Sequence, residues 1–261
     1  MAKVLVISGG SSGIGKATAS LFAERGWRVF ELSRHGISHE GIIHVDCDVC
    51  SEQSTRAAIE EVMRQTDAID VLISNAGYGI SGAVEFSAIS EAEHQMDVNF
   101  MGAVRLTQAI LPVLRAQKYG RIIYTSSVAA SLAVPYQAFY SASKAAINAL
   151  ALALANEVRE FGISVSVMMP GDVSTGFTDA RSKSTAGEDI YRGANKAITT
   201  MEKDERGGMR PEQMARLFYH IATCHSPRPQ YVGGFQYRVL CLLDRILPKR
   251  LVNWIEFKVY S

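Results

Sequence analysis

Residues 3–26 read KVLVISGGSSGIGKATASLFAERG, and this stretch decides the fold. Its first six residues form a short apolar run typical of a buried strand, and its last eleven place apolar or small residues at helical spacing. Between them, Gly9, Gly13 and Gly15 follow the strand and open the helix. Glycine tolerates positive φ and lets the backbone approach a pyrophosphate, which the helix N-terminus attracts. The stretch predicts a phosphate-binding strand–turn–helix unit, although its GxxxGxG spacing differs from the commoner GxGxxG.

Strand-type and helical patterns then alternate along almost the whole chain. Further strands are predicted at 27–32, 41–46, 68–77, 120–127 and 163–171, and further helices at 51–66, 90–115 and 137–161. This alternation predicts one α/β domain over residues 1–261, a doubly wound Rossmann fold whose parallel sheet has helices on both faces. Ligands of such sheets bind outside the carboxyl ends of the strands. The polar stretch 174–210 is expected to be an irregular loop that serves as a substrate lid.

The overall composition is that of an ordinary globular protein. Hydrophobic residues make up 48% of the 261 residues, charged residues 20%, and the net charge is +1, so nothing global indicates nucleic acid or an anionic membrane. The start, MAKVLVISGG, lacks the features of a signal peptide, and no apolar run reaches the roughly 18 residues that span a bilayer. We expect a cytoplasmic enzyme.

A CxxC pair, Cys47 and Cys50, follows His44 at a spacing that metal sites use. A structural zinc site usually needs four ligands, and no second pair follows. A redox pair would stand near a thioredoxin-like pattern, which is not evident. We therefore expect free thiols and no metal.

The second predicted strand ends in Ser33 and Arg34. An acidic residue at this position usually accepts from the ribose 2′-hydroxyl of NAD(H), whereas serine and a guanidinium can bind the 2′-phosphate of NADP(H). We therefore expect NADP(H) in preference to NAD(H). The alternative is an arginine on a solvated turn.

The helix at 137–161 is mostly alanine and small residues, yet it carries Tyr140 and Lys144 four positions apart, on one face. Ser127 stands thirteen positions before the tyrosine. A core tyrosine with a lysine that reaches for water is one interpretation. The other is an acid–base pair, in which a nearby ammonium lowers the pKa of the phenol.

Six short motifs in the same order resemble those of the short-chain dehydrogenase/reductase family, over about residues 3–222. They are SGGSSGIG, SNAG (74–77), DVNFMG, the SS that ends at Ser127, YSASK and PGDVST (170–175). Ser8 and Ser74 depart from the family's threonine and asparagine but keep small polar side chains. The resemblance implies that Tyr140 is the general acid–base, that Ser127 holds the reacting oxygen, that Lys144 binds the nicotinamide ribose, and that Asn99 positions a water behind the lysine.

The resemblance also implies a set of cofactor contacts. They are Gly9, Ser11, Ser12, Gly13, Ile14, Gly15, Ser33, Arg34, Asp48, Val49, Asn75, Ala76, Gly77, Tyr140, Lys144, Pro170, Gly171, Val173 and Thr175. For Asp48, a turn or helix-capping role is an equal alternative.

The substrate pocket is expected to be mostly apolar, which suits a hydrophobic alcohol or ketone. Its predicted lining is Ser127, Val128, Ala129, Tyr136, Tyr140 and Phe177. The apolar tail, 232–261, is similar to that of the retinol-dehydrogenase and 17β-hydroxysteroid-dehydrogenase branch. It is expected to cover the pocket, form a subunit interface or lie on a membrane, and the membrane ranks last because Asp244 and Glu256 interrupt it.

The sequence thus predicts an NADP(H)-dependent alcohol dehydrogenase/carbonyl reductase that forms a homodimer or homotetramer through its long helices. Two alternatives remain open: a reductase of polar acyl or sugar ketones, and a non-catalytic NADP-binding regulator.

Overall fold

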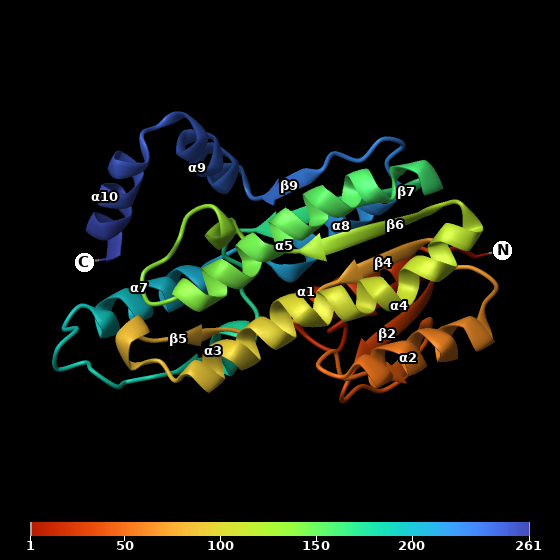
Figure 1. The fold of residues 1–261 in the computed structure, drawn as a ribbon, viewed down its shortest axis with the longest axis horizontal. Coiled ribbons are helices and arrows are strands. Elements are labelled where there is room, and N and C mark those ends of the chain that lie inside the picture. The colour runs from red at the N-terminus through yellow and green to blue at the C-terminus, as the bar shows by residue number, and fades with distance from the viewer. Residues whose placement is uncertain (1, 261) are drawn as a thin grey trace.

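The computed structural model describes residues 2–260, in which a seven-stranded parallel sheet forms the centre. Its strands are β1 Val4–Ser8, β2 Arg28–Ser33, β3 Ile42–Asp46, β4 Val71–Ser74, β6 Gly120–Thr125, β7 Ile163–Pro170 and β9 Gln230–Gly233. Their order is β3-β2-β1-β4-β6-β7-β9 (Figure 1). The chain winds outward from β1 in one direction and then, from β4, in the other, so the crevice at the carboxyl ends of β1 and β4 is the place where such sheets bind ligands. The predicted fold is confirmed.

Helices cover both faces of this sheet. On one face lie α2 Glu52–Gln65, α4 Gly102–Gln117 and α5 Ala138–Glu157, and on the other lie α1 Gly13–Glu24 and α8 Pro211–Thr223. Successive strand residues alternate between the two cores: Phe30 and Leu32 pack against the α2–α4–α5 layer, and Val29 packs against the α1–α8 layer. Both faces are therefore buried, which explains the nearly continuous apolar strands.

Among the described residues, α5 is the one helix long and apolar enough to cross a bilayer. It packs along β7, however, and buries Ile147, Ala151 and Leu154 against the sheet. We therefore assign α5 to the core.

The helix predicted at 90–115 is interrupted. α3 spans Ile89–Met96, a π-helical turn (η2) spans Asp97–Met101, and α4 follows directly. A π turn inserts one extra residue into the helical repeat and often marks a functional site. Here the turn carries Asn99, which is buried.

The expectation of an irregular loop at 174–210 is wrong. This segment contains α6 Phe177–Ala180, β8 Ser182–Lys183 and α7 Ala194–Arg206, and β8 pairs with β5, Ile80–Ser81. α7 buries one apolar face, made of Ala194, Ala197, Ile198 and Met201. The other residues of α7 are polar, so the average composition of 174–210 concealed the apolar face of this helix.

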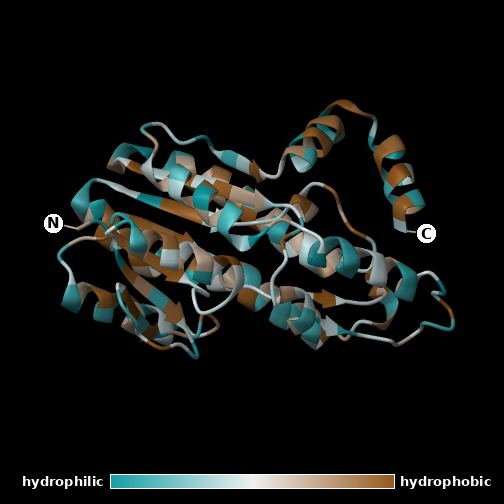
Figure 2. Ribbon diagram, turned by 180° about the vertical axis from the view of Figure 1, so that it is seen from behind, coloured by the Kyte–Doolittle hydropathy of each residue, from teal (hydrophilic) through white to brown (hydrophobic). Residues whose placement is uncertain are grey.

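The chain ends in two helices, α9 Phe235–Ile246 and α10 Lys249–Tyr260, separated by Leu247 and Pro248. The break between them falls at Pro248, which lacks an N–H donor. Both helices extend away from the main body (Figures 1 and 2).

Candidate active site

The glycine turn between β1 and α1 has the backbone that an anion site needs. Gly9 and Gly13 adopt φ of +66° and +51°. A methyl group on Gly15 would lie 2.0 Å from the Gly9 carbonyl oxygen, so the helix approaches the turn closer than any side chain allows. The side chain of Ser12, at the N-cap, makes no capping hydrogen bond. The first N–H groups of α1 are therefore available to a phosphate.

Ser8 ties this turn to the end of β4. Its hydroxyl oxygen accepts hydrogen bonds from the N–H groups of Asn75 and Ala76, at 3.0 and 3.1 Å. The Asn75 amide donates in return to the carbonyls of Ser8 and Gly9, at 3.2 and 3.3 Å. Serine here thus supplies the hydroxyl that the family's threonine would supply.

The end of β2 offers both a cation and an acid to a nucleotide. The hydroxyl of Ser33 is buried and has no protein partner, and Arg34 is exposed. A 2′-phosphate beside Ser33 and Arg34 would satisfy that hydroxyl. Glu31 lies beneath Gly10 of the turn, and its Oε1 is also buried without a partner. The residues therefore fit NADP(H), but Glu31 is an acidic group close by.

His44 is the partner of that acid, and both of its ring nitrogens face carboxylates. Its Nδ1 lies 2.7 Å from Glu31 Oε2, and its Nε2 lies 3.0 Å from Asp46 Oδ1. Burial lowers the pKa of His44, but the two carboxylates outweigh it and the net change is a rise. A protonated imidazole balances the Glu31 charge below that raised pKa.

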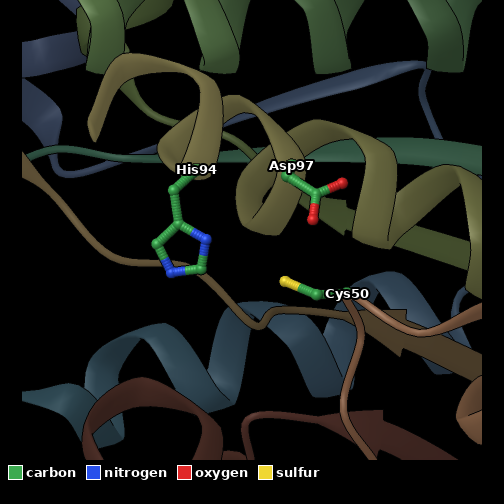
Figure 3. A group of neighbouring side chains, drawn as sticks. All are labelled: Cys50, His94 and Asp97. Carbon is green, nitrogen blue, oxygen red and sulfur yellow. The ribbon is translucent and has the colours of Figure 1, made fainter. Parts of the chain in front are cut away.

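Cys47 and Cys50 are free thiols, as predicted, and they lie in different environments. Cys47 is buried, whereas Cys50 meets His94 and Asp97 from the α3–η2 segment, with ligand atoms within 4.8 Å of one another (Figure 3). Burial, together with a hydrogen bond to Asp97, raises the pKa of the Cys50 thiol to about 12. The Arg105 guanidinium already binds Asp97, at 2.6 Å. A protonated thiol and a neutralised carboxylate favour a hydrogen-bonded cluster over a cation site.

Asp48 and Val49 lie between β3 and α2, at the predicted adenine position. The Asp48 carboxylate accepts from the N–H of Cys50 at 2.9 Å, so it has the turn-forming role that was the open alternative. The Val49 carbonyl accepts from Arg105 at 3.1 Å, and its side chain packs on Gly102. These contacts hold the loop between β3 and α2 in place.

The four predicted catalytic residues lie together at the carboxyl edge of the sheet. The Ser127 hydroxyl hydrogen-bonds to the Tyr140 side chain. The Lys144 ammonium lies 5.7 Å from the centroid of the Tyr140 ring and donates to the Thr125 carbonyl at 3.0 Å. A methyl group on Gly77 would approach Asn99 Oδ1 to 3.0 Å and Lys144 Nζ to 3.4 Å. The lysine and the asparagine are thus neighbours across that glycine.

Asn99 is held rigidly by its π turn. Its side-chain amide donates to the Tyr78 carbonyl at 2.9 Å and to the Ser143 hydroxyl at 3.1 Å. Its amide oxygen accepts from the Tyr78 N–H, also at 2.9 Å. Both amide hydrogens are thus engaged, so the side chain can offer a water only the second lone pair of its oxygen.

Burial controls both titrating groups of the pair. It raises the pKa of Tyr140 to about 12, although the Ser127 hydrogen bond opposes the rise, and it lowers the pKa of Lys144 to about 8. In the protein alone the pKa of Tyr140 is thus raised, and the lowering expected from Lys144 together with a positive nicotinamide ring stays a prediction for the oxidised complex. The ammonium is directed at the Thr125 carbonyl, and desolvation dominates. At neutral pH the phenol carries its proton and can donate it.

The segment after β7 lies across the mouth of the site. The N–H of Gly171, next to Pro170, donates to the Gly233 carbonyl, and Val173 forms a β-bridge with Met209. Thr175 lies within 4 Å of a methyl group placed on Gly13, so it faces the glycine turn. The sequence did not reveal that the Tyr237 ring covers Gly171 and that its hydroxyl donates to Asp172.

The predicted substrate residues are only partly brought together. Phe177 packs beside Tyr140, with ring centroids 5.8 Å apart, and Val128 and Ala129 form a 3₁₀ turn (η3, Val128–Ala130) directly after Ser127. Tyr136 instead faces Tyr191, with ring centroids 6.5 Å apart. That contact places it against the lid.

Sequence reasoning missed Arg181, a buried cation in this pocket. Its side chain is fully buried, lies 5.6 Å from the Phe177 ring centroid and binds Glu205, while its Nη1 has no partner. Arg181 and Glu205 both act on the charge of Tyr140, in opposite directions. Because Arg181 stands in a polar run, its pattern is that of a solvated lid residue, and only the fold places it inside.

Comparison with known proteins shows extensive similarity. Residues 3–186 match the family model for short chain dehydrogenase. The chain is 38% identical over 229 residues to a 3-ketodihydrosphingosine reductase of Bacteroides thetaiotaomicron, which covers 86% of this chain and 85% of that protein. The crystal structure of a short-chain dehydrogenase from Streptomyces avermitilis has a TM-score of 0.84 at 25% identity, over 99% of this chain and 97% of that chain. A dehydrogenase/reductase from Burkholderia phymatum in complex with NAD has a TM-score of 0.80 at 24% identity, over 93% and 92%, and supports the fold alone.

Proposed function

The chain belongs to the short-chain dehydrogenase family, and from this premise we propose that it is an NADP(H)-dependent reductase of a hydrophobic ketone. The observation that carries the proposal is the meeting of Ser127, Tyr140 and Lys144 beside the glycine turn. Tyr140 and Lys144 are both present, which argues against a non-catalytic regulator. The cofactor, when bound, supplies the hydride.

Each residue then has a role that its position supports. Ser127 donates to the carbonyl oxygen of the substrate and steadies its developing negative charge. Tyr140 gives its proton to that oxygen, and in the oxidation of an alcohol it takes the proton back. Lys144 supplies an adjacent positive charge once Tyr140 is deprotonated, which limits the cost of forming a buried phenolate.

A hydrophobic substrate is supported by two features. The first is the apolar character of the side chains next to the catalytic pair, Val128 and Ala129 after Ser127 and Phe177 beside Tyr140. The second is the relative whose name gives a long-chain lipid ketone as its substrate, 3-ketodihydrosphingosine. We retain a homodimer or homotetramer and a cytoplasmic location as predictions.

One observation favours the second candidate, a reductase of polar acyl or sugar ketones. The free Nη1 of buried Arg181 could bind a carboxylate, phosphate or hydroxyl of such a substrate. Against this, Glu205 already balances the charge of Arg181, so no net positive charge remains for an anion.

The test is a comparison of ketones with the purified protein, followed at the nicotinamide absorbance. We expect NADPH oxidation with long-chain 2-amino-3-ketones, steroid ketones or retinaldehyde, and much less with short acyl thioesters or ketosugars. Turnover confined to the polar ketones would favour the second candidate. Binding of NADPH without turnover of any alcohol or ketone would favour a regulator.

Arg34→Glu tests the cofactor preference. Losing one charge-assisted hydrogen bond costs about 1.5–3 kcal/mol, so NADPH affinity should fall about 10–100-fold. NADH affinity should change little, because NADH has no 2′-phosphate. Fluorescence titration with both cofactors measures this. Arg56→Glu, an exposed change on α2, is the control. An unchanged NADPH affinity in Arg34→Glu would mean that Arg34 is only a residue of a solvated turn, and the proposed preference for NADP(H) over NAD(H) would be dropped.

A further inference from the structure

Exposed apolar side chains are concentrated in the C-terminal hairpin, which we define as α9, residues 247–248 and α10. Of the 18 large apolar side chains that are exposed in residues 2–260, eleven belong to it: Phe235, Val239, Leu240, Leu242, Leu243, Ile246, Leu251, Trp254, Ile255, Phe257 and Val259. Figure 2 shows these two helices as a largely hydrophobic pair at the edge of the molecule. A surface of this kind marks an interaction site.

Each helix presents its apolar residues as a stripe. On α9, Phe235, Val239, Leu242 and Ile246 recur at intervals of three or four residues. On α10, Leu251, Ile255 and Val259 do the same, while Val252, Glu256 and Tyr260 are less exposed. This spacing puts one continuous apolar face on each helix.

Of the two acids that interrupt this segment, Asp244 is buried and Glu256 is half-buried. Asp244 is 7% exposed and is bound to Lys249. One carboxylate oxygen of Glu256 is buried, and burial raises the pKa of Glu256. The reason for ranking a membrane last is therefore weakened.

The exposed charges that remain are all positive. Five basic residues of the hairpin are exposed: Arg238, Arg245, Lys249, Arg250 and Lys258. Apolar stripes flanked by cations, with no exposed carboxylate within the described hairpin, are typical of helices that lie in the interface of an anionic bilayer.

The hairpin also adjoins the proposed active site. Tyr237 of α9 covers Gly171 at the mouth of the site, and α10 packs on α7 of the lid. Tyr260, at the end of α10, lies close enough to Asp172 of the segment after β7 to sense its charge. Burial and that charge raise the pKa of Tyr260 to about 12.

We propose that the C-terminal hairpin docks on a bilayer of anionic phospholipid. Its apolar stripes enter the boundary between headgroups and acyl chains, its cations contact the headgroup phosphates, and a lipid-like ketone reaches the site directly from the membrane. The last step rests on the proposed function.

A second copy of the chain fits this surface less well. A two-fold interface sets the same patch against itself, so the five exposed cations would meet a surface that offers them no exposed carboxylate of the hairpin. Like charges brought together in this way oppose association. An anionic lipid surface is complementary instead.

Cosedimentation of the full-length protein with vesicles tests the docking. We expect binding to vesicles of equimolar phosphatidylcholine and phosphatidylglycerol, weakened by high salt, and little binding to phosphatidylcholine alone. Trp254 reports its own insertion, because Trp27, the other tryptophan, is buried. The Trp254 emission should therefore shift to the blue when vesicles are added.

The double variant Leu251→Glu/Ile255→Glu should weaken vesicle binding at least about tenfold, since it places two carboxylates in the apolar stripe. Ile89→Glu is the matched control, because Ile89 is also exposed but lies on α3. Circular dichroism and thermal unfolding confirm that both variants are folded, and the wild-type Trp254 shift stands independently of them.

Three results would overturn the docking. The first is the absence of vesicle binding by the wild type, and the second is equal binding to neutral and anionic vesicles. The third is a double variant that binds vesicles normally while its mass in solution falls by light scattering, which would make the hairpin a subunit interface. Turnover of a small water-soluble ketone in the absence of vesicles tests the proposed function separately. If no such turnover were found, the proposed function would fail while the docking could still hold.

Discussion

Tyr140→Phe should lower kcat by about 10²–10⁴-fold, the usual contribution of a positioned general acid, while the affinity for NADPH stays almost unchanged. The change removes only the hydroxyl that hydrogen-bonds to Ser127. The ring keeps its packing against Phe177, at 5.8 Å between centroids, so the walls of the pocket should stay in place. A proton that Tyr140 no longer gives would have to come from water, which a buried site admits poorly.

The size of this effect follows from the protonation states in the site. Burial raises the pKa of Tyr140 to about 12, so at neutral pH almost every molecule holds the proton that carbonyl reduction consumes. The same burial would make the reverse reaction require deprotonation of the phenol, which becomes easier as pH rises. Oxidation of an alcohol by the wild type should therefore increase with pH more steeply than reduction of the ketone.

Tyr124→Phe is the control for Tyr140→Phe. Tyr124 is also a buried tyrosine with a hydroxyl partner, Thr107, but it lies in the core between the sheet and α4. Both variants should lose about 1 kcal/mol of unfolding free energy for one hydrogen bond, and only Tyr140→Phe should lose turnover. Stopped-flow absorbance and NADPH titration separate the two effects. Wild-type turnover by Tyr140→Phe would disprove the assigned chemistry.

The sequence predicted the sheet and the catalytic group because both depend on local patterns. Apolar runs such as KVLVIS and ISVSVMMPG identify buried strands, and the spacing of Tyr140 and Lys144 fixes their common helix face. The glycine turn was equally clear, since its conformation requires backbone angles that glycine adopts most easily.

The remainder depended on contacts between distant segments. No periodicity shows where an extra residue enters a helix, so the π turn at Asn99 was missed. Arg181 and Glu205 stand in polar stretches and become a buried pair only when the lid packs over the site. The raised pKa of Tyr140 in the protein alone depends on distant segments too, because desolvation comes from the whole fold whereas the local motif shows only the lysine.

Gly15→Ala should weaken dinucleotide binding at least about tenfold and destabilise the fold, although alanine is the better helix former. Gly15 is the third residue of α1, and even in a helix interior the change from glycine to alanine gains only up to about 1 kcal/mol of helix propensity. The added methyl group would lie 2.0 Å from the Gly9 carbonyl oxygen and 2.7 Å from the Asn75 amide, and backbone atoms cannot move away as a flexible side chain would. Overpacking of this kind costs about 1–3 kcal/mol, so the clash should outweigh the helical gain.

The consequence of Gly15→Ala for ligand binding is larger than that for stability. Moving Gly9 away breaks its contact with Asn75 and turns the phosphate-binding N–H groups, so NADPH and NADH affinity should both fall by at least about tenfold, for the loss of one charge-assisted hydrogen bond or more. Gly207→Ala is the matched control, since a methyl group there meets only ordinary contacts, at 3.4 Å or beyond. Thermal unfolding and calorimetric titration with both cofactors measure the two effects. Cofactor affinity that survives in Gly15→Ala would mean that the pyrophosphate does not lie on this turn, and the dinucleotide would then have to be placed elsewhere along the carboxyl edge of the sheet.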